Sequence, residues 1–150
     1  MSPLQKKLAD TIIISMKARE IERVKVMRNV QAVIKQIEVD RRVELDDADV
    51  LDVLQKQLKQ RQESLAIFTE NNRDDLATKE QFEIDIINEF MPKQMDDSEI
   101  AALVNTEIAA QGATSMRDMG AVMGSLKKKT AGRADPALIS KLVKEALQPS

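Results

Sequence analysis

The chain has 150 residues, 43% of them hydrophobic and 32% charged, which is enough apolar material for one packed domain or two small ones. It contains no cysteine and no histidine, so disulfides, thiolate chemistry, histidine general bases and the usual zinc ligands are excluded. It has no apolar run near the roughly 20 residues of a membrane span and no signal-peptide pattern, so we expect a soluble, cytoplasmic protein without a membrane or metal partner.

The net charge of −2 conceals an uneven distribution along the chain. Residues 6–42 hold ten basic and five acidic side chains, residues 43–92 hold five and thirteen, and residues 112–150 hold seven and three. Basic surface is therefore available at both ends of the chain, on either side of an acidic middle.

The first ninety residues are predicted to be almost entirely helical, because no glycine and no proline lies between Pro3 and Pro92. Ser2 with Gln5 has the form of a capping box, with Pro3 at the first helical position. The expected helices run from Pro3 to about Met16, from about Glu20 to Asp40, from Asp46 to about Asn71, and from about Asp75 to Met91. The second of them carries the apolar positions Ile21, Val24, Met27, Val30, Ile34 and Ile37.

One charged residue interrupts the apolar spacing of the third predicted helix. Arg61 occupies a position where an apolar residue is expected, and Glu80 and Glu83 lie on the inner side of the next helix. An unpaired charge there would be costly, so we predict a structural ion pair between Arg61 and one of the glutamates. A catalytic or di-metal carboxylate pair is the alternative, but metal-binding bundles use a Glu-x-x-His motif and the chain has no histidine.

Three short helices are predicted beyond Pro92. Asp96 with Glu99 caps the first, which Gly112 ends; Ser115 with Asp118 caps the second; and Asp135, with Pro136 at the first helical position, caps the third. The fold class is thus all-α, with an N-terminal bundle of about four helices over residues 1–92 and a three-helix domain over residues 93–150.

The second of these helices has unusual composition, since residues 119–135 contain three of the four glycines and three consecutive lysines. At 100° per residue, Gly120, Gly124, Lys127 and Lys128 gather away from the apolar stripe. Each glycine inside a helix costs about 1 kcal/mol relative to alanine, so this face suggests close approach of another molecule. The alternative is that the glycines only permit tight packing against a neighbouring helix while the lysines favour the helix C-terminus.

Ordered motifs along nearly the whole chain carry a resemblance to a known family. They are Lys59-Gln60-Arg61 with Glu63 and Ser64, Arg73-Asp74-Asp75-Leu76, Glu80 with Glu83, Phe90-Met91-Pro92-Lys93-Gln94-Met95, Met119-Gly120, Val122-Met123-Gly124, and Gly132-Arg133-Ala134-Asp135. The chain resembles the GatB/YqeY family, in particular its stand-alone YqeY-like members. It departs from the family at Pro136, where glycine is usual, and at Arg41-Arg42, in a loop that often contains glycine.

The resemblance implies two all-helical domains and kinship with the tail of the GatB component of the glutamine-dependent amidotransferase that acts on misacylated Glu-tRNA or Asp-tRNA. In that enzyme the tail contacts the tRNA elbow, and the chemistry lies in other domains and subunits. The family label is carbon-nitrogen ligase activity with glutamine as amido-N-donor. This chain has no nucleophile motif and no phosphate-binding loop for such a reaction, so we identify no catalytic residue and no cofactor.

We therefore expect an accessory protein associated with tRNA or with a tRNA-modifying or aminoacylation enzyme. The candidate RNA-binding residues are Gly120, Gly124, Lys127, Lys128, Lys129, Arg133, Lys141 and Lys144. The phenylalanines, Phe68, Phe82 and Phe90, all lie on or near predicted core faces, which favours recognition of RNA shape and phosphates over base stacking. The alternative is a helical adaptor that binds another protein and makes no RNA contact.

Overall fold

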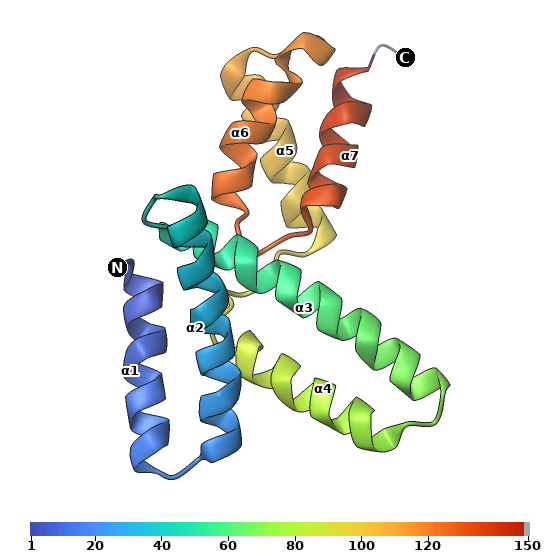
Figure 1. Ribbon diagram of the computed structural model, residues 1–150. Coiled ribbons are helices and arrows are strands. Elements are labelled where there is room, and N and C mark those ends of the chain that lie inside the picture. The colour runs from blue at the N-terminus through green and yellow to red at the C-terminus, as the bar shows by residue number, and fades with distance from the viewer. Residues whose placement is uncertain (149–150) are drawn as a thin grey trace. The chain divides into compact units, whose positions relative to one another are not determined.

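The protein is all-helical, as a computed structural model that describes residues 1–148 shows (Figure 1). Within those residues there are seven α-helices, one short 3₁₀ helix and no strand, which confirms the predicted fold class. The elements are α1 (Pro3–Lys17), α2 (Ile21–Arg41), α3 (Asp47–Glu70), α4 (Asp74–Asn88), α5 (Asp97–Gln111), η1 (Met116–Asp118), α6 (Met119–Lys129) and α7 (Pro136–Leu147).

The chain divides into two compact units, the first covering Met1–Met91 and the second beginning at Pro92. In the first unit, α1 and α2 form one antiparallel hairpin, and α3 and α4 form another (Figure 1). Its most deeply buried side chains, each at most 2% exposed, are Met27, Ile34, Val50, Leu54 and Ile87.

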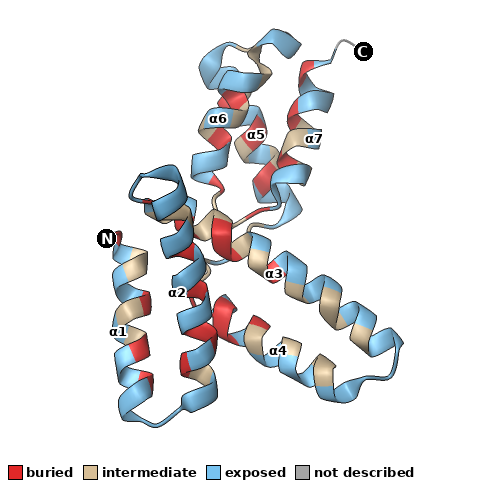
Figure 2. Cartoon of the chain, in the orientation of Figure 1, coloured by how far each residue is buried: buried red, intermediate tan, exposed pale blue. Residues whose placement is uncertain are grey.

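The second unit packs α5, α6 and α7 against one another around a separate core. Its most deeply buried side chains are Val104, Val122, Leu126, Ile139 and Val143, each at most 2% exposed. The buried stripes of these helices are visible in Figure 2.

The helix caps largely follow the predicted pattern. Asp46 and Asp49 form both halves of a capping box at the start of α3, and Asp135 Oδ1 accepts a hydrogen bond from the Ala137 amide at 2.9 Å. Ser2 accepts one from the Gln5 amide at 3.2 Å, but the Gln5 side chain does not return to Ser2. It extends to Glu38 on α2, so the predicted box at α1 is half formed and the other half links two helices.

Several expectations about the first unit are wrong in detail. The last predicted helix of the bundle ends at Asn88 and not at Met91, because the chain turns there and places Phe90 in the core. Ile21 is 66% exposed, because it lies nine positions before the buried Val30 and therefore on the opposite side of α2. Phe82 is 43% exposed and so does not lie on a core face.

One expectation about the second unit also needs refinement. The capping box of Ser115 and Asp118 is present, but it opens the 3₁₀ turn η1, and α6 starts only at Met119. Gly112 caps α5 in the left-handed conformation with φ +62°, as the sequence predicts.

Candidate nucleic-acid interface

The basic face of α6 consists of Gly120, Gly124, Lys127 and Lys128. All four residues are exposed, and α-helical geometry places them on one side of α6, opposite the buried Val122 and Leu126. Neither lysine forms an ion pair among residues 1–148. The ammonium groups of Lys127 and Lys128 therefore lie beside a bare strip of helix, formed by Gly120 and Gly124, that carries no side chain.

The two glycines of this face have open space around them. A Cβ atom built on Gly120 or Gly124 meets no other heavy atom of the chain within 4 Å, leaving aside the adjacent helix backbone. Neither residue has the positive φ that would require glycine, in contrast to Gly112 and Gly132. Tight packing against a neighbouring helix of this chain therefore does not account for them.

Lys129 is directed elsewhere, although it belongs to the same run of lysines. Its Nζ lies 2.6 Å from Glu107 Oε2 on α5, and the Glu107 side chain is only 7% exposed. The Lys129 ammonium, with hydrogen bonds from Ser125 and Gln111, lowers the pKa of the Glu107 carboxyl to about 2. Lys129 is thus engaged in holding α6 to α5.

Arg133 is engaged with the segment that precedes α5. Its Nε donates to the Lys93 carbonyl at 3.1 Å, and its Nη2 lies 4.0 Å from Glu99. The Arg133 carbonyl in turn accepts a hydrogen bond from the Met95 amide at 2.9 Å, and the neighbouring Gly132 carbonyl accepts one from Gln94 at 2.6 Å. These bonds anchor the loop between α6 and α7.

Lys141 and Lys144 lie on the solvent side of α7, away from the buried Ile139 and Val143. Neither forms an ion pair among the described residues. The eight candidate residues thus fall into three groups: four on the face of α6, two on α7, and Lys129 and Arg133, whose charges are occupied within the unit.

The structure places the three residues of the predicted ion pair together in the first unit. Arg61 on α3 forms an ion pair with Glu83 on α4, and its Nη1 lies 3.6 Å from Glu80 Oε2. All three side chains are largely buried, with exposed fractions of 22%, 13% and 18% for Arg61, Glu83 and Glu80. Within residues 1–148, no group of three or more histidine, cysteine, aspartate or glutamate side chains could hold a metal ion.

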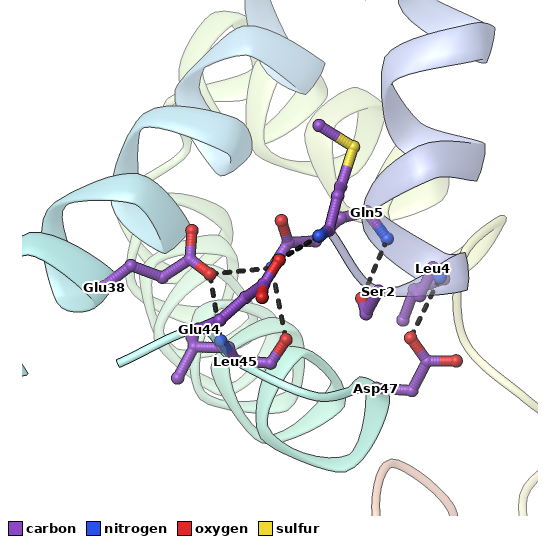
Figure 3. A network of polar contacts seen from close by, with 8 residues as sticks. Ser2, Leu4, Gln5, Glu38, Glu44, Leu45 and Asp47 are labelled. Atoms are coloured by element: carbon purple, nitrogen blue, oxygen red, sulfur yellow. Dashed lines mark hydrogen bonds and ion pairs between the residues drawn. The ribbon is translucent and has the colours of Figure 1, made fainter. Parts of the chain in front are cut away.

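A second polar cluster in the first unit was not predicted. Glu38 Oε2 accepts hydrogen bonds from the Leu45 amide at 2.9 Å and from the Gln5 side chain at 3.3 Å (Figure 3). The Leu45 amide is the main cause that lowers the pKa of the Glu38 carboxyl, and the Gln5 amide adds to it. No local sequence pattern predicts this cluster, because the Gln5 side chain was expected to cap α1 together with Ser2.

Fold and surface together define the class: an all-helical protein of two compact units, the second of which presents a basic helix face thinned by glycine. None of the helices in the described part of the chain is long and apolar enough to cross a bilayer.

The chain belongs to the YqeY-like family, because residues 5–147 match the family described as "Yqey-like protein". Two similar curated proteins share the name "Altered inheritance of mitochondria protein 41, mitochondrial". The one from Eremothecium gossypii is 30% identical over 113 residues, which cover 75% of this chain and 58% of that protein. The one from Vanderwaltozyma polyspora is 27% identical over 100 residues, which cover 62% and 54%. The chain therefore spans just over half the length of each relative.

Proposed function

We propose that the chain binds tRNA, or a structured RNA of similar shape, through the basic face of α6. The observation that carries this proposal is the open space at Gly120 and Gly124 beside two unpaired lysines. A helix glycine that neither adopts a positive φ nor makes room for a neighbouring segment of this chain lowers the stability of the helix, and nothing within the chain compensates for that loss. Contact with a partner that approaches the helix backbone would compensate for it.

A phosphate backbone matches this face in both charge and shape. Lys127 and Lys128 can neutralise phosphates, and the bare strip at Gly120 and Gly124 lets a ribose-phosphate chain approach the helix closely. All three phenylalanines lie outside the second unit, so this unit offers no aromatic platform for unstacked bases. These features favour recognition of a folded RNA by its shape over reading of a single-stranded sequence.

The proposed role is that of an accessory protein to tRNA amidation or aminoacylation, with the chemistry performed by a partner enzyme. It is supported by the family to which the chain belongs, whose resemblance to the tail of the amidotransferase implies contact with tRNA, and by the absence of a nucleophile motif in the sequence. We also propose a cytoplasmic location, on the sequence alone; the two relatives carry the word mitochondrial in their names.

The first experiment measures the affinity of the full chain for unmodified tRNA as a function of salt, by filter binding or fluorescence anisotropy. We expect the Lys127→Ala/Lys128→Ala variant to bind at least about ten-fold more weakly, with a salt slope smaller by about two. The control is Lys59→Ala/Lys79→Ala, which removes two exposed lysines of the first unit and should bind as the parent does. Equal binding by both variants, or no binding by the parent, contradicts the proposal.

A second experiment separates RNA contact from simple charge. Gly124→Ala should raise the free energy of unfolding by about 1 kcal/mol, because the added methyl group meets nothing in the chain and alanine favours the helix. If RNA backbone lies against this strip, the same variant should bind tRNA several-fold more weakly. Asn105→Ala, at an exposed position of α5, controls for helix stabilisation alone. A more stable Gly124→Ala variant with unchanged affinity would show that the strip is not the contact.

A further inference from the structure

The outer face of α1 is exposed to solvent and has its own pattern of apolar and charged residues. Four exposed residues share the spacing i, i+3, i+4 and i+7, which places them on one side of the helix: Asp10, Ile13, Ile14 and Lys17. The buried residues Leu8, Ile12 and Ser15 lie on the opposite side, toward α2 (Figure 2). The outer face therefore takes no part in packing α1 against its own bundle.

The middle of this face is apolar although it is exposed. Ile13 and Ile14 are 51% and 66% exposed. Met16 and Ile21, 49% and 66% exposed, lie close by in the sequence, so exposed apolar side chains are concentrated at this end of the α1–α2 hairpin. A single exposed apolar residue is common on protein surfaces, but a group of them is typical of a contact with another molecule.

The two charged residues of the face have opposite signs and no partner in the described part of the chain. Neither Asp10 nor Lys17 forms an ion pair or a side-chain hydrogen bond among residues 1–148. They are seven residues apart, which is about 10.5 Å along the helix axis. The midpoint between them falls between Ile13 and Ile14, so the two charges lie at equal distances on either side of the apolar pair.

We propose that this face binds a second copy of the chain, with the two α1 helices antiparallel about a two-fold axis that passes between Ile13 and Ile14. Asp10 then lies opposite the partner's Lys17, and Lys17 lies opposite the partner's Asp10. The isoleucines of both copies meet at the centre. Such an interface uses the same surface on both subunits and closes as a dimer. A parallel pair in the same register would place like charges together, so the charges select the antiparallel arrangement.

The symmetry of the face favours this occupant over others. A nucleic acid or an anionic lipid surface is attracted by a cationic face, whereas this one carries one charge of each sign. Of the neighbouring cations, Lys7 lies over the Phe90 ring, with Nζ 5.7 Å from its centroid, and Lys6 lies one turn beyond Asp10, at the edge of the face. An unrelated protein would not require opposite charges placed equally about the isoleucines. The face belongs to the first unit and does not depend on the RNA proposal.

The first test measures the mass of the full chain by sedimentation equilibrium at low ionic strength, over about 10–500 µM. We expect a reversible equilibrium between monomer and dimer. Ile14→Glu places a carboxylate at the apolar centre of the contact and should weaken dimerisation at least about ten-fold. Ile67→Glu, at a 56% exposed isoleucine of α3, is the matched control and should leave dimerisation unchanged. A chain that stays monomeric at the highest concentration, or two variants that behave alike, overturns the proposal.

Exchange of the two charges tests the antiparallel arrangement. Asp10→Lys and Lys17→Asp should each weaken self-association several-fold at low salt, because each substitution places like charges opposite each other at both ends of the contact. An equal mixture of these two single variants should form a mixed dimer, and the double variant Asp10→Lys/Lys17→Asp should dimerise as the parent does. All four positions are exposed, and circular dichroism checks that each variant remains folded. Single variants that associate as the parent does, or a double variant as weak as the single ones, overturn the proposed interface.

Discussion

The two units differ in where they place glycine. The first unit has none, yet three of its residues, Arg19, Arg42 and Asn72, adopt the left-handed conformation that glycine favours, with φ of 60°, 54° and 57°. The second unit contains all four glycines of the chain. Two of them, Gly112 and Gly132, have positive φ, whereas Gly120 and Gly124 do not.

This difference separates two uses of the same residue. Glycine at a helix end relieves backbone strain, so Gly112 is explained by the fold of α5 alone. Glycine on the exposed side of α6 relieves nothing inside the chain and lowers helix stability. The comparison therefore identifies α6 as the helix whose sequence departs from what folding alone would favour, as is expected of a binding surface.

The units also differ in how they treat buried charge. In the first unit, Arg61 lies between two glutamates of the facing helix. In the second, the buried charge is the Glu107 carboxylate, and its partner Lys129 reaches it from a half-exposed position, with 53% of the side chain exposed. The four predictions below test the comparison of the two units. The first asks whether their separate cores unfold independently.

The largest effects should come from the cores. Leu126→Ala in the second unit and Leu54→Ala in the first each remove a side chain that is at most 2% exposed, and each should lower the free energy of unfolding by about 2–5 kcal/mol. Because each unit has its own core, each variant should lose NMR amide signals of its own unit first as urea rises. Ile67→Ala, at a 56% exposed position, is the control. Simultaneous loss of all signals in both variants would show that the units unfold as one.

The next effect concerns Arg61. Arg61→Met should lower the free energy of unfolding by about 1–3 kcal/mol, because it leaves Glu80 and Glu83 close together and without their cation. Adding Glu80→Gln and Glu83→Gln to that variant should restore most of the loss. Arg73→Ala removes an arginine whose pair with Asp75 is well exposed and should have no measurable effect. Higher stability of Arg61→Met, with no effect of the two glutamine substitutions alone, would contradict a structural ion pair.

Most of the fold could be predicted from the sequence, because helix caps and apolar spacing are local signals. Asp46, Asp135 and Gly112 begin or end their helices as predicted. The juxtaposition of Arg61 with Glu80 and Glu83 was also accessible, since a charge at a seam position needs a partner on the facing helix.

The features that the sequence did not predict depend on packing between helices. The contact of Lys129 with Glu107 joins residues 22 positions apart, and it requires the way in which α5 lies against α6. Phe82 was misplaced because it lies five positions before the buried Ile87, which turns its side chain about 140° away from Ile87 around α4.

The third prediction concerns pH and tests the buried carboxylate of the second unit. The pKa of Glu107 is lowered from 4.5 to about 2 in the folded chain, mainly by Lys129. A carboxyl with a lower pKa in the folded state contributes stability that is fully present above the unfolded pKa and is lost as the pH falls toward the folded value. The melting temperature of the parent should therefore fall between about pH 5 and pH 2.

The contribution of Glu107 is isolated by difference, because the pKa values of Glu38, Asp75 and Asp118 are also lowered in the folded chain. Glu107→Gln should have a lower melting temperature than the parent at pH 7, and the gap should narrow as the pH falls toward 2. Asp10→Asn, at an exposed position of α1, is measured beside it as the matched variant. A gap that stays constant for Glu107→Gln would show that its carboxylate is not stabilised by folding.

The smallest expected effect comes from introducing glycine into the first unit, at a residue with positive φ. Arg42 caps the C-terminus of α2 with φ 54°, and its amide donates a hydrogen bond to the Val39 carbonyl at 3.3 Å. Glycine is the residue most favoured in this left-handed conformation at a helix end. Arg42→Gly should therefore raise the free energy of unfolding by about 0.5–1 kcal/mol by relieving left-handed strain, although part of the gain is offset by the greater freedom of the unfolded chain. Urea unfolding of the full chain measures the change, with Arg41→Gly, inside α2, as the matched variant that should be destabilised. If both glycine variants are less stable than the parent, the left-handed conformation of Arg42 carries no strain that glycine would relieve. The contrast between glycine at turns and glycine on the exposed face of α6 would then not hold for the first unit.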